Sequence, residues 1–412
     1  MRTLKLLAVL ALALPWVTSC YVDEQLGAAP LPNTGELMRR YLSIGNSITA
    51  GFQSAGINDS TQQLAYPVLF ARAIGTGFAV PSLTMPGCPP PIVNNATVPP
   101  TRVDQGSETT CLLRSHEPLP PFFNNLAVPG AHVIDPLNNL DAESNANLLT
   151  MLILGGKTQV QAMTDANPTF VSVWIGNNDV LGALTSSTNP GDPAEITSQA
   201  NFEARVRGIF DAIDLSGASA AAISVGNITL IPFASRGFFY WCGSVSSMGL
   251  CGTPPQFPPT FTVDGSCAPA VAGGQGDDNL VPWTVGIPKI AAALQGVATF
   301  LDCTDDSQVA TPAEVAGMVA AVDGYNTFLV AEAAARGYGY FDINPSLQDA
   351  VNDGRIPPFP DLSGVPVGGP VTFGPLFTLD GVHPSSETHR LVADSLISVV
   401  NQTFGTTIRS LP

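Results

Sequence analysis

A serine that follows a short apolar run is the first residue of this sequence whose setting suits chemistry. The run Tyr41–Ile44 predicts a buried strand, and Gly45 and Asn46 end it with a pair that is typical of a turn. Ser47 follows directly. A strand end and a turn hold a hydroxyl on a rigid element beside free main-chain N–H groups, which suits a nucleophile. The alternative is that this serine caps a helix, so the hypothesis needs partners elsewhere in the chain.

One of the four histidines has a well-spaced carboxylate partner. His383 follows Asp380 by three residues, on a predicted turn just before the last predicted helix. A carboxylate at this spacing can accept the ring N–H, fix the tautomer and stabilise the imidazolium. We therefore predict that His383 is a base oriented by Asp380, and we interpret His116, His132 and His389 as structural.

Attack on a carbonyl also requires donors for the developing oxyanion. Gly130 follows the short apolar segment 125–128 and offers a main-chain N–H with no side chain in the way. Asn178 follows the apolar segment 169–175 and offers a side-chain amide. We predict an oxyanion site formed by these two residues and the N–H of Ser47. A turn glycine and a helix cap are the alternative interpretations.

Predicted strands and helices alternate along the chain, which predicts a parallel sheet covered by helices on both faces, an α/β fold. Because ligands bind at the carboxyl ends of such strands, Ser47, Gly130 and Asn178 are expected at one edge of the sheet. The predicted strands are 41–44, 125–128, 169–175, 220–231 and 338–343, and the predicted helices are 62–74, 145–163 with a break near 155–156, 193–215, 287–300, 312–336 and 385–400.

Composition excludes one class of partner. The chain has 412 residues, with 16 Lys and Arg against 33 Asp and Glu, for a net charge of −17. Such a surface repels phosphate backbones, and the sequence contains no basic run, so we expect no nucleic-acid partner. At 45% hydrophobic residues the chain can bury a large core despite its 39 glycines and 37 prolines.

The N-terminus predicts export. A short basic region precedes the apolar run Leu6–Val17, which is too short to span a bilayer. The sequence Val17-Thr18-Ser19-Cys20 resembles a bacterial lipobox, which implies a signal peptide over 1–19, lipidation of Cys20 and a tether over 20–38. An ordinary secretory signal cleaved near Ser19 is the alternative. Tyr21 after the cysteine favours anchoring at the outer membrane of the cell envelope, facing either side.

The other six cysteines indicate disulfides, because an even number in an exported chain is typical of them. Several connectivities are possible, and proximity in sequence favours Cys88–Cys111, Cys242–Cys251 and Cys267–Cys303. Zinc is the competing interpretation, but no pair has the Cys-x2-Cys spacing. The cysteines fall in two Pro-rich segments, 80–121 and 233–310, which we interpret as insertions. The second is rich in aromatic residues and is expected to form a cap or a substrate wall.

Taken in chain order, these motifs resemble the four sequence blocks of the SGNH (GDSL-type) hydrolases: Gly45–Ile48, Gly130, Gly176–Asp179 and Asp380–His383. The resemblance covers residues 41 to about 395. It implies a three-layer α/β/α sandwich with a flavodoxin-like sheet, a hydrolase domain over 39–405, and hydrolysis of carboxylic esters.

Carried over residue by residue, the resemblance implies Ser47 as nucleophile, His383 as base and Asp380 as the residue that orients it. The oxyanion hole would comprise the N–H groups of Ser47 and Gly130 and the amide of Asn178. Acyl transfer would proceed in two steps and would need no metal or cofactor. The family's usual aspartate before the serine is Asn46 here, and the two insertions are long, so a substrate cannot be transferred from the family.

The substrate is therefore expected only as a class, a small-molecule ester. Aromatic residues in the second insertion and a membrane tether favour an esterase or lipase that acts on medium or long acyl chains. A carbohydrate acetyl esterase is the nearest alternative, since aromatic rings also stack on sugars. A catalytically inactive surface binding lipoprotein is a third, although binding alone would not require the complete set of blocks. Oligomeric state is not predicted.

Overall fold

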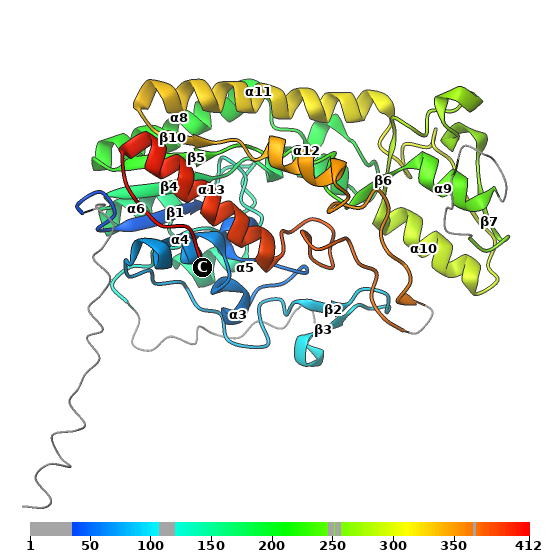
Figure 1. The fold of residues 1–412 in the computed structure, drawn as a ribbon, viewed down its shortest axis with the longest axis horizontal. Helices are drawn as coiled ribbons and strands as arrows, with labels where there is room; N and C mark the ends of the chain where they lie inside the picture. Colours follow the sequence, from blue (N-terminus) through cyan, green and yellow to red (C-terminus); the bar gives the residue numbers. More distant parts are fainter. Residues whose placement is uncertain (1–34, 107–119, 246–250, 252–256, 366–367) are drawn as a thin grey trace, which may run out of the picture.

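A computed structural model describes residues 35–106, 120–245, 251, 257–365 and 368–412 (Figure 1). Its main sheet is parallel, with four strands in the order β1-β4-β5-β10: β1 Tyr41–Gly45, β4 Phe170–Trp174, β5 Ser219–Ile223 and β10 Gly339–Phe341. The segment 125–128 extends the sheet beyond β1, since the Leu126 N–H donates to the Ser43 oxygen at 2.9 Å in a parallel bridge. Numbered along the chain, the order is 2-1-3-4-5, the flavodoxin-like order.

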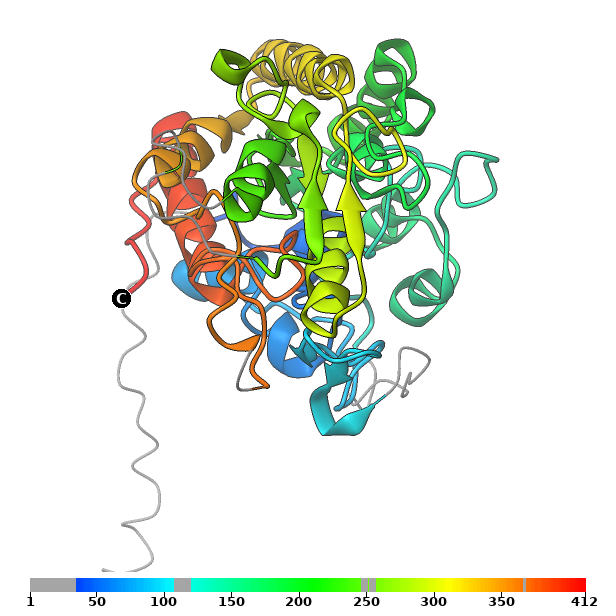
Figure 2. The same ribbon diagram turned by 90° about the vertical axis from the view of Figure 1, so that its right-hand side faces the viewer.

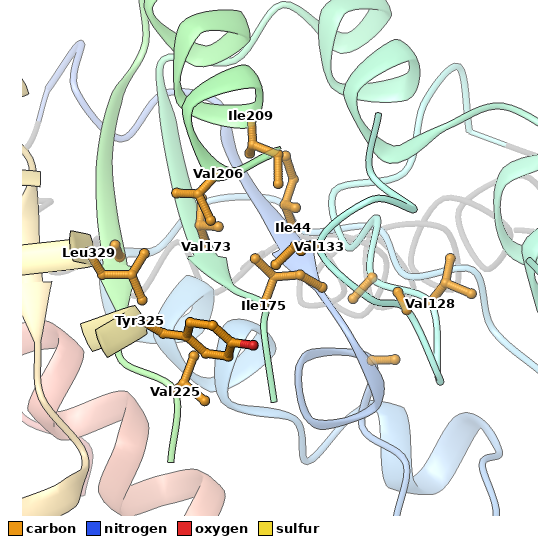
Figure 3. Packing of buried hydrophobic residues seen from close by; sticks show 14 of the residues in the cluster. Ile44, Val128, Val133, Val173, Ile175, Val206, Ile209, Val225, Tyr325 and Leu329 are labelled. Carbon is orange, nitrogen blue, oxygen red and sulfur yellow. The ribbon is translucent and has the colours of Figure 1, made fainter. Parts of the chain in front are cut away.

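Successive residues of each strand face opposite sides of the sheet, and both sides are buried, which explains the almost continuous apolar runs. On β1, Tyr41 packs with α4 (Tyr66–Ile74) and α13 (Ser386–Phe404). Leu42 and Ile44 belong to the core under α8 (Gln199–Ser216) and α11 (Pro312–Arg336). Figure 3 shows the core on the α8 and α11 side, in which Ile44 and Val173 from the sheet lie near Val206 and Ile209 of α8. The predicted α/β/α sandwich is confirmed.

Helices of the sandwich follow the predicted segments closely. Pro67 stands in the first turn of α4, so that helix begins late, and the break near Gly155 separates α5 from α6. The helix bounds are α2 Ser47–Ala50, α3 Asp59–Gln62, α4 Tyr66–Ile74, α5 Leu148–Leu154, α6 Gln159–Ala166, α7 Asn178–Thr185, α8 Gln199–Ser216, α11 Pro312–Arg336, α12 Asn344–Asn352 and α13 Ser386–Phe404, with short 3₁₀ helices at Val103–Gln105 and Pro193–Glu195.

Three parts of the chain differ from the predicted secondary structure. The predicted strand 220–231 ends at Ile223, and a turn follows in which the Leu230 N–H donates to the Asn227 oxygen. The predicted helix 287–300 begins earlier, at Trp283, and ends at Leu294, and Thr299–Leu301 is a strand. The segment after β10, for which we predicted neither helix nor strand, contains α12, which begins at Asn344 with a proline in its first turn.

The second insertion forms a lobe at one end of the sheet (Figures 1 and 2). It has its own core of buried aromatic, aliphatic and cysteine side chains, including Tyr240, Phe261 and Leu301. Its elements are β6 Ala234–Arg236, α9 Gly237–Ser244, β7 Phe261–Val263, β8 Leu280–Pro282, α10 Trp283–Leu294 and β9 Thr299–Leu301, with 3₁₀ helices at Gly265–Cys267 and Ala270–Ala272. β6 pairs with β8, and β7 with β9.

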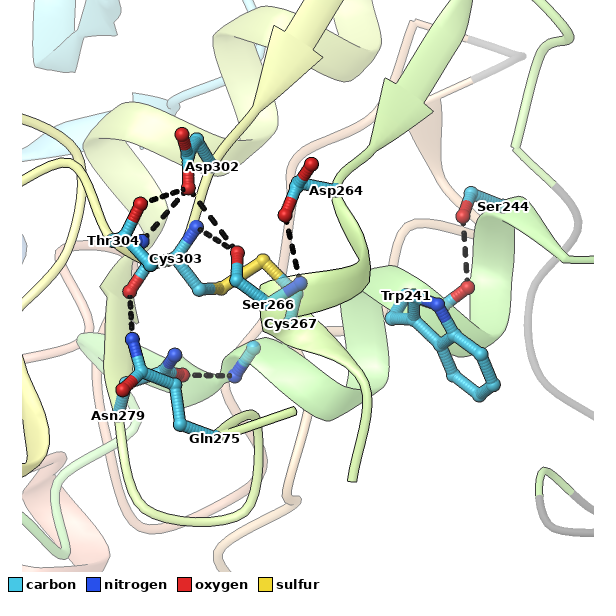
Figure 4. The surroundings of a disulfide bond; sticks show 11 residues. Trp241, Ser244, Asp264, Ser266, Cys267, Gln275, Asn279, Asp302, Cys303 and Thr304 are labelled. Atoms are coloured by element: carbon cyan, nitrogen blue, oxygen red, sulfur yellow. Dashed lines mark hydrogen bonds between the residues drawn. A yellow bond between two sulfur atoms is a disulfide. The ribbon is translucent and has the colours of Figure 1, made fainter. Parts of the chain in front are cut away.

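Two disulfides lie within this lobe, as predicted: Cys242–Cys251 and Cys267–Cys303, with Cα atoms 5.4 and 5.1 Å apart. Around the second, Ser266 accepts the Cys303 N–H at 3.1 Å and Gln275 donates to the Cys303 oxygen (Figure 4). The third predicted pair includes Cys111, which lies outside the described residues.

The first insertion contributes a small hairpin, β2 Ile92–Asn94 with β3 Thr101–Arg102. Residues 1–34 lie outside the described part of the chain, so the signal peptide, Cys20 and most of the tether stay predictions. Within the described part, every helix is too short or too polar to cross a membrane.

Candidate active site

The structure brings Ser47, His383 and Asp380 together. His383 Nε2 lies 2.9 Å from the Ser47 hydroxyl oxygen, and His383 Nδ1 lies 2.8 Å from Asp380 Oδ2. Because Nδ1–H donates to the carboxylate, Nε2 is left to accept the serine proton. The imidazole and the carboxylate are only 14% and 10% exposed as side chains, so little water competes for these bonds.

Asp380 is held as an anion by a set of donors. Its Oδ1 accepts the N–H groups of Val382 and His383, each at 2.9 Å, and its Oδ2 accepts the Ala55 N–H at 2.6 Å. The hydroxyl of Thr378 adds a bond of 3.1 Å. Burial raises the pKa of this carboxyl, but the positive charge and hydrogen bonds of His383 and the main-chain donors outweigh it and lower the pKa to about 2.

The turn that supplies the Ala55 N–H is strained. Ser54 and Ala55 have φ angles of 52° and 51°, a region that residues with a side chain rarely occupy. The turn is secured from the other side, where Ser54 N–H donates to Thr378 Oγ1 at 2.9 Å. This backbone conformation points the Ala55 N–H at Asp380. Residues with strained backbone conformations are common at functional sites.

Ser47 is the first residue of α2, and Asn46 is the residue that caps this helix. Asn46 Oδ1 accepts the Ile48 N–H at 3.2 Å. One position earlier, Gln159 of α6 binds Gly45 twice: the Gly45 N–H donates to its Oε1, and its Nε2 donates to the Gly45 oxygen, both at 2.9 Å. Gln159 is 1% exposed. The main chain that presents Ser47 is therefore fixed on both sides, and the serine itself is free for chemistry.

The amide at position 46 does what an aspartate there would do for the cap, since either side chain offers an oxygen. It differs in its second atom. Asn46 is 1% exposed, and its Nδ2 has no hydrogen-bond partner among the described residues. Asn177, which follows β4, has a side-chain oxygen, Oδ1, that likewise has no hydrogen-bond partner among the described residues. Both residues line the cavity beside Ser47, so one donor and one acceptor remain available there.

Gly130 and Asn178 lie on the two strand ends that flank β1. The Val128 N–H donates to the Gly45 oxygen at 3.2 Å, so Gly130 and Ser47 are each two residues past paired positions. Asn178 Nδ2 donates to the Ala131 oxygen at 2.9 Å and so reaches the same loop. The main-chain N–H groups of Ser47 and Gly130 have no partner within the described chain.

A buried carboxylate holds this loop from below. Asp179 is 0% exposed, and its oxygens accept the Val133 N–H at 3.0 Å and the Thr197 hydroxyl at 2.8 Å. Burial raises its pKa to about 6, although the charge of His132 and these hydrogen bonds act in the opposite direction. His132 thus lies near the site without touching Ser47. Its main-chain N–H donates to Asp135 Oδ2 at 2.6 Å.

His389 is buried and structural. It is 0% exposed on α13, its Nδ1 accepts the Tyr66 N–H at 3.3 Å, and its ring stacks on that of Tyr66. Burial, together with a smaller contribution from the charge of the nearby His383, lowers its pKa to about 3. The ring is therefore neutral at physiological pH. His116 lies outside the described residues.

A cavity opens beside Ser47 and His383. Its polar end comprises Asn46, Ser47, Asn177, Asn178 and His383. Apart from Thr388, the rest of its lining is apolar. It comes from residues at or after the ends of β4, β5 and β10 and from α7, α12 and α13, among them Trp174, Leu181, Ile228, Leu347, Phe377 and Val392. An apolar cavity with a few convergent polar groups is the usual form of a small-molecule site.

The second insertion does not form the expected wall of this cavity. Among its described residues, none from 233–310 lines the cavity, and its aromatic side chains pack mainly into the core of their own lobe. The lobe instead contacts the turn that carries Asp380, where Trp283 Nε1–H donates to the main-chain oxygen of Asp380 at 3.1 Å. Gln159, Thr378, Ala55 and Trp283 are the positioning contacts that sequence reasoning missed.

Comparisons with known proteins add little to this geometry. No family model and no curated protein matches the sequence. Solved structures similar to this chain include two variants of the acetylxylan esterase Axe2 from Geobacillus stearothermophilus. One is 12% identical with a TM-score of 0.37, covering 88% of this chain and 94% of the other. The second is 12% identical with a TM-score of 0.38, covering 90% and 97%. A candidate SGNH hydrolase from Slackia heliotrinireducens is 13% identical with a TM-score of 0.32, covering 88% and 98%.

Proposed function

We propose that this protein is a serine carboxylic ester hydrolase of the esterase or lipase type, acting on a small-molecule ester. The observation that carries the proposal is the unbroken chain of contacts from Asp380 through His383 to Ser47, with bonds of 2.8 and 2.9 Å. The order of the sequence blocks, which resembles that of the SGNH hydrolases, supports the same conclusion. A binding protein would have no need of a buried carboxylate that orients a histidine ring toward a serine hydroxyl.

In the proposed reaction, His383 takes the Ser47 proton as the hydroxyl oxygen attacks the ester carbonyl. Asp380 stabilises the imidazolium and keeps the ring in place. The tetrahedral oxyanion accepts hydrogen bonds from the N–H groups of Ser47 and Gly130 and from the amide of Asn178. The alcohol leaves with the proton from His383. Water then attacks the acyl-serine by the same steps, which releases the acid and restores the hydroxyl.

Substitution of the two reacting residues tests the proposal. We expect Ser47→Ala and His383→Ala each to lower kcat on p-nitrophenyl acetate by a factor on the order of 10⁴ or more, with the far-UV spectrum unchanged. A fluorophosphonate should modify Ser47 of the native protein once, as seen by mass spectrometry. Ser307→Ala, which removes an exposed hydroxyl from the insertion, is the matched control and should keep full activity. Activity retained by Ser47→Ala would refute the mechanism.

We also propose that the chain is exported and attached to the bacterial cell envelope, at the outer membrane, through a lipid on Cys20. The lipobox-like sequence before this cysteine supports the proposal. In a bacterial host that processes lipoproteins, palmitate label should enter the native chain and not Cys20→Ser. Equal release of both proteins into the soluble fraction would contradict the anchor.

A further inference from the structure

A larger cavity lies next to the one that holds Ser47. It is placed between α12 and α13 and reaches the surface among the polar side chains of Asp349, Arg355 and Asp394. The second cavity has a volume of about 340 Å³, against about 70 Å³ for the cavity beside Ser47. Most of the room near the nucleophile is therefore not directly beside it.

A single layer of side chains divides the two cavities. Five residues line both: Ile343, Leu347, Phe377, Thr388 and Val392. We name this layer the dividing wall. Phe377 is 8% exposed and Val392 is 1% exposed, so both are fixed by packing. Leu347 stands on α12 opposite α13 and is half-buried.

The dividing wall affects how long an acyl chain the cavity beside Ser47 can accept. The groups that would act on the carbonyl, Ser47 and His383, lie with three asparagines in the small cavity, and the rest of its lining is apolar apart from Thr388. An apolar acyl chain fits such a lining, and each buried methylene would strengthen binding by about fourfold if room exists for it. No described residue of the aromatic insertion extends this cavity, and the wall bounds it on the side that faces the second cavity.

We propose that the dividing wall, through its large apolar residues Leu347, Phe377 and Val392, limits this protein to esters of short acyl groups. The second cavity is the room that a longer chain would enter if the wall were opened. This inference rests on the proposed ester hydrolysis and reverses the preference for medium or long chains that the aromatic insertion indicated. A chain that reaches the wall would have to displace packed side chains, so we expect longer chains to be disfavoured by roughly 10-fold or more.

The test uses the purified protein with p-nitrophenyl acetate, butyrate, octanoate and laurate. For the native protein we expect the highest kcat/KM with acetate or butyrate and a value at least 10-fold lower with octanoate. Phe377→Ala and Leu347→Ala open the wall from two separate elements, and each should raise the ratio of octanoate to acetate kcat/KM by at least 10-fold. The ratio is the readout because Phe377 lies three residues before Asp380, and a disturbance of that turn affects all esters alike.

Two further variants identify the route of the longer chain. Phe300→Ala removes an exposed phenylalanine of the insertion that lines neither cavity, and it should leave the ratio unchanged. Ser395 lines only the second cavity. In the double variant Phe377→Ala with Ser395→Phe, the new ring fills that cavity, so the ratio should return toward the native value.

The outcomes separate this inference from the proposed function. A native protein that hydrolyses octanoate or laurate as well as acetate overturns the limiting wall and leaves ester hydrolysis standing. Unchanged ratios in both Phe377→Ala and Leu347→Ala, with acetate activity present, also overturn it. Absence of hydrolysis with every ester refutes the proposed function itself, and the wall with it.

Discussion

Trp283 donates its indole N–H to the main-chain oxygen of Asp380 across a distance of 3.1 Å. The main-chain N–H of Trp283 donates to the Phe233 oxygen at 2.8 Å, and the indole ring lies against the ring of Phe373. The first residue of α10 therefore ties the base of the disulfide-stapled lobe to the turn that carries Asp380 and His383. The lobe supports the proposed triad from behind, although it does not line the cavity.

Trp283→Phe tests this support, because it keeps an aromatic ring and removes the hydrogen bond. A neutral hydrogen bond contributes about 1 kcal/mol, so we expect kcat to fall roughly fivefold with little change in KM. Trp241→Phe is the matched control, since Trp241 is buried in the lobe and does not contact Asp380. Equal kcat values for Trp283→Phe and the native protein would show that the lobe does not position Asp380.

His389 should make stability depend on pH. Its pKa is about 3 in the folded protein and about 6.5 in an unfolded chain, so the unfolded chain binds the proton more readily. Stability is therefore complete above pH 6.5 and is lost as pH falls toward 3. At pH 5 the loss from this residue is about 2 kcal/mol.

Comparison with His389→Asn isolates this effect. The asparagine can offer an oxygen to the Tyr66 N–H and does not titrate, and its smaller volume costs stability equally at every pH. Urea unfolding of both proteins at pH 5, 6, 7 and 8 should show the native protein losing its advantage as the solution is acidified. The contributions of other carboxyl groups cancel in the difference. A constant difference between the two curves would mean that His389 is already free to ionise when folded.

Asp179 predicts a pH trend of the opposite sign. Its pKa is raised to about 6 in the folded protein, above the ordinary 3.8, so the folded state holds the proton more tightly. The stabilisation is present below pH 3.8 and is lost as pH rises through 6. Asp179→Asn removes a buried charge and keeps one oxygen for Val133. We expect a higher urea midpoint than the native protein at pH 8 and a smaller difference at pH 4. A lower midpoint at pH 8 would show that the carboxylate stabilises the loop as an anion.

The sheet and the contacts of Ser47, His383 and Asp380 could be predicted because they carry strong local signals. β1 and β4 are apolar on both faces, and the turn after each presents Ser47 and Asn178 at the same edge. Asp380 and His383 are close in sequence, so their contact is local. Two disulfides followed from cysteine spacing for the same reason.

The rest depends on contacts that leave no pattern in the sequence. Gln159 and Trp283 act through hydrogen bonds to main-chain atoms more than 90 residues away, and such bonds require no motif in the partner. α12 is short, and its apolar residues Leu347, Ala350 and Val351 have helical spacing but span little more than one turn, so they do not distinguish a helix from a loop. The cavity wall arises where α12 meets α13, and therefore could not be predicted before either helix was placed.

Gly130→Ala tests the proposed oxyanion donor. Gly130 has a φ of +86°, and a Cβ there would lie 2.8 Å from Asn145 Nδ2, the atom that donates to the Gly130 oxygen. An alanine in this region costs about 1–2 kcal/mol, and relief of the strain would turn the N–H away from the site. Loss of one oxyanion donor lowers kcat by roughly 10² to 10³, so we expect a fall of that size with KM nearly unchanged.

Gly155→Ala separates strain from chemistry. Gly155 ends α5 with a φ of +64°, and no atom within 4 Å would meet a Cβ there, so the substitution has a comparable backbone cost far from Ser47. Both variants should unfold at lower urea concentration than the native protein, and only Gly130→Ala should lose turnover of p-nitrophenyl acetate. If the two variants lose stability equally and both keep the native kcat, the Gly130 N–H does not stabilise the oxyanion, and the donors reduce to Ser47 and Asn178.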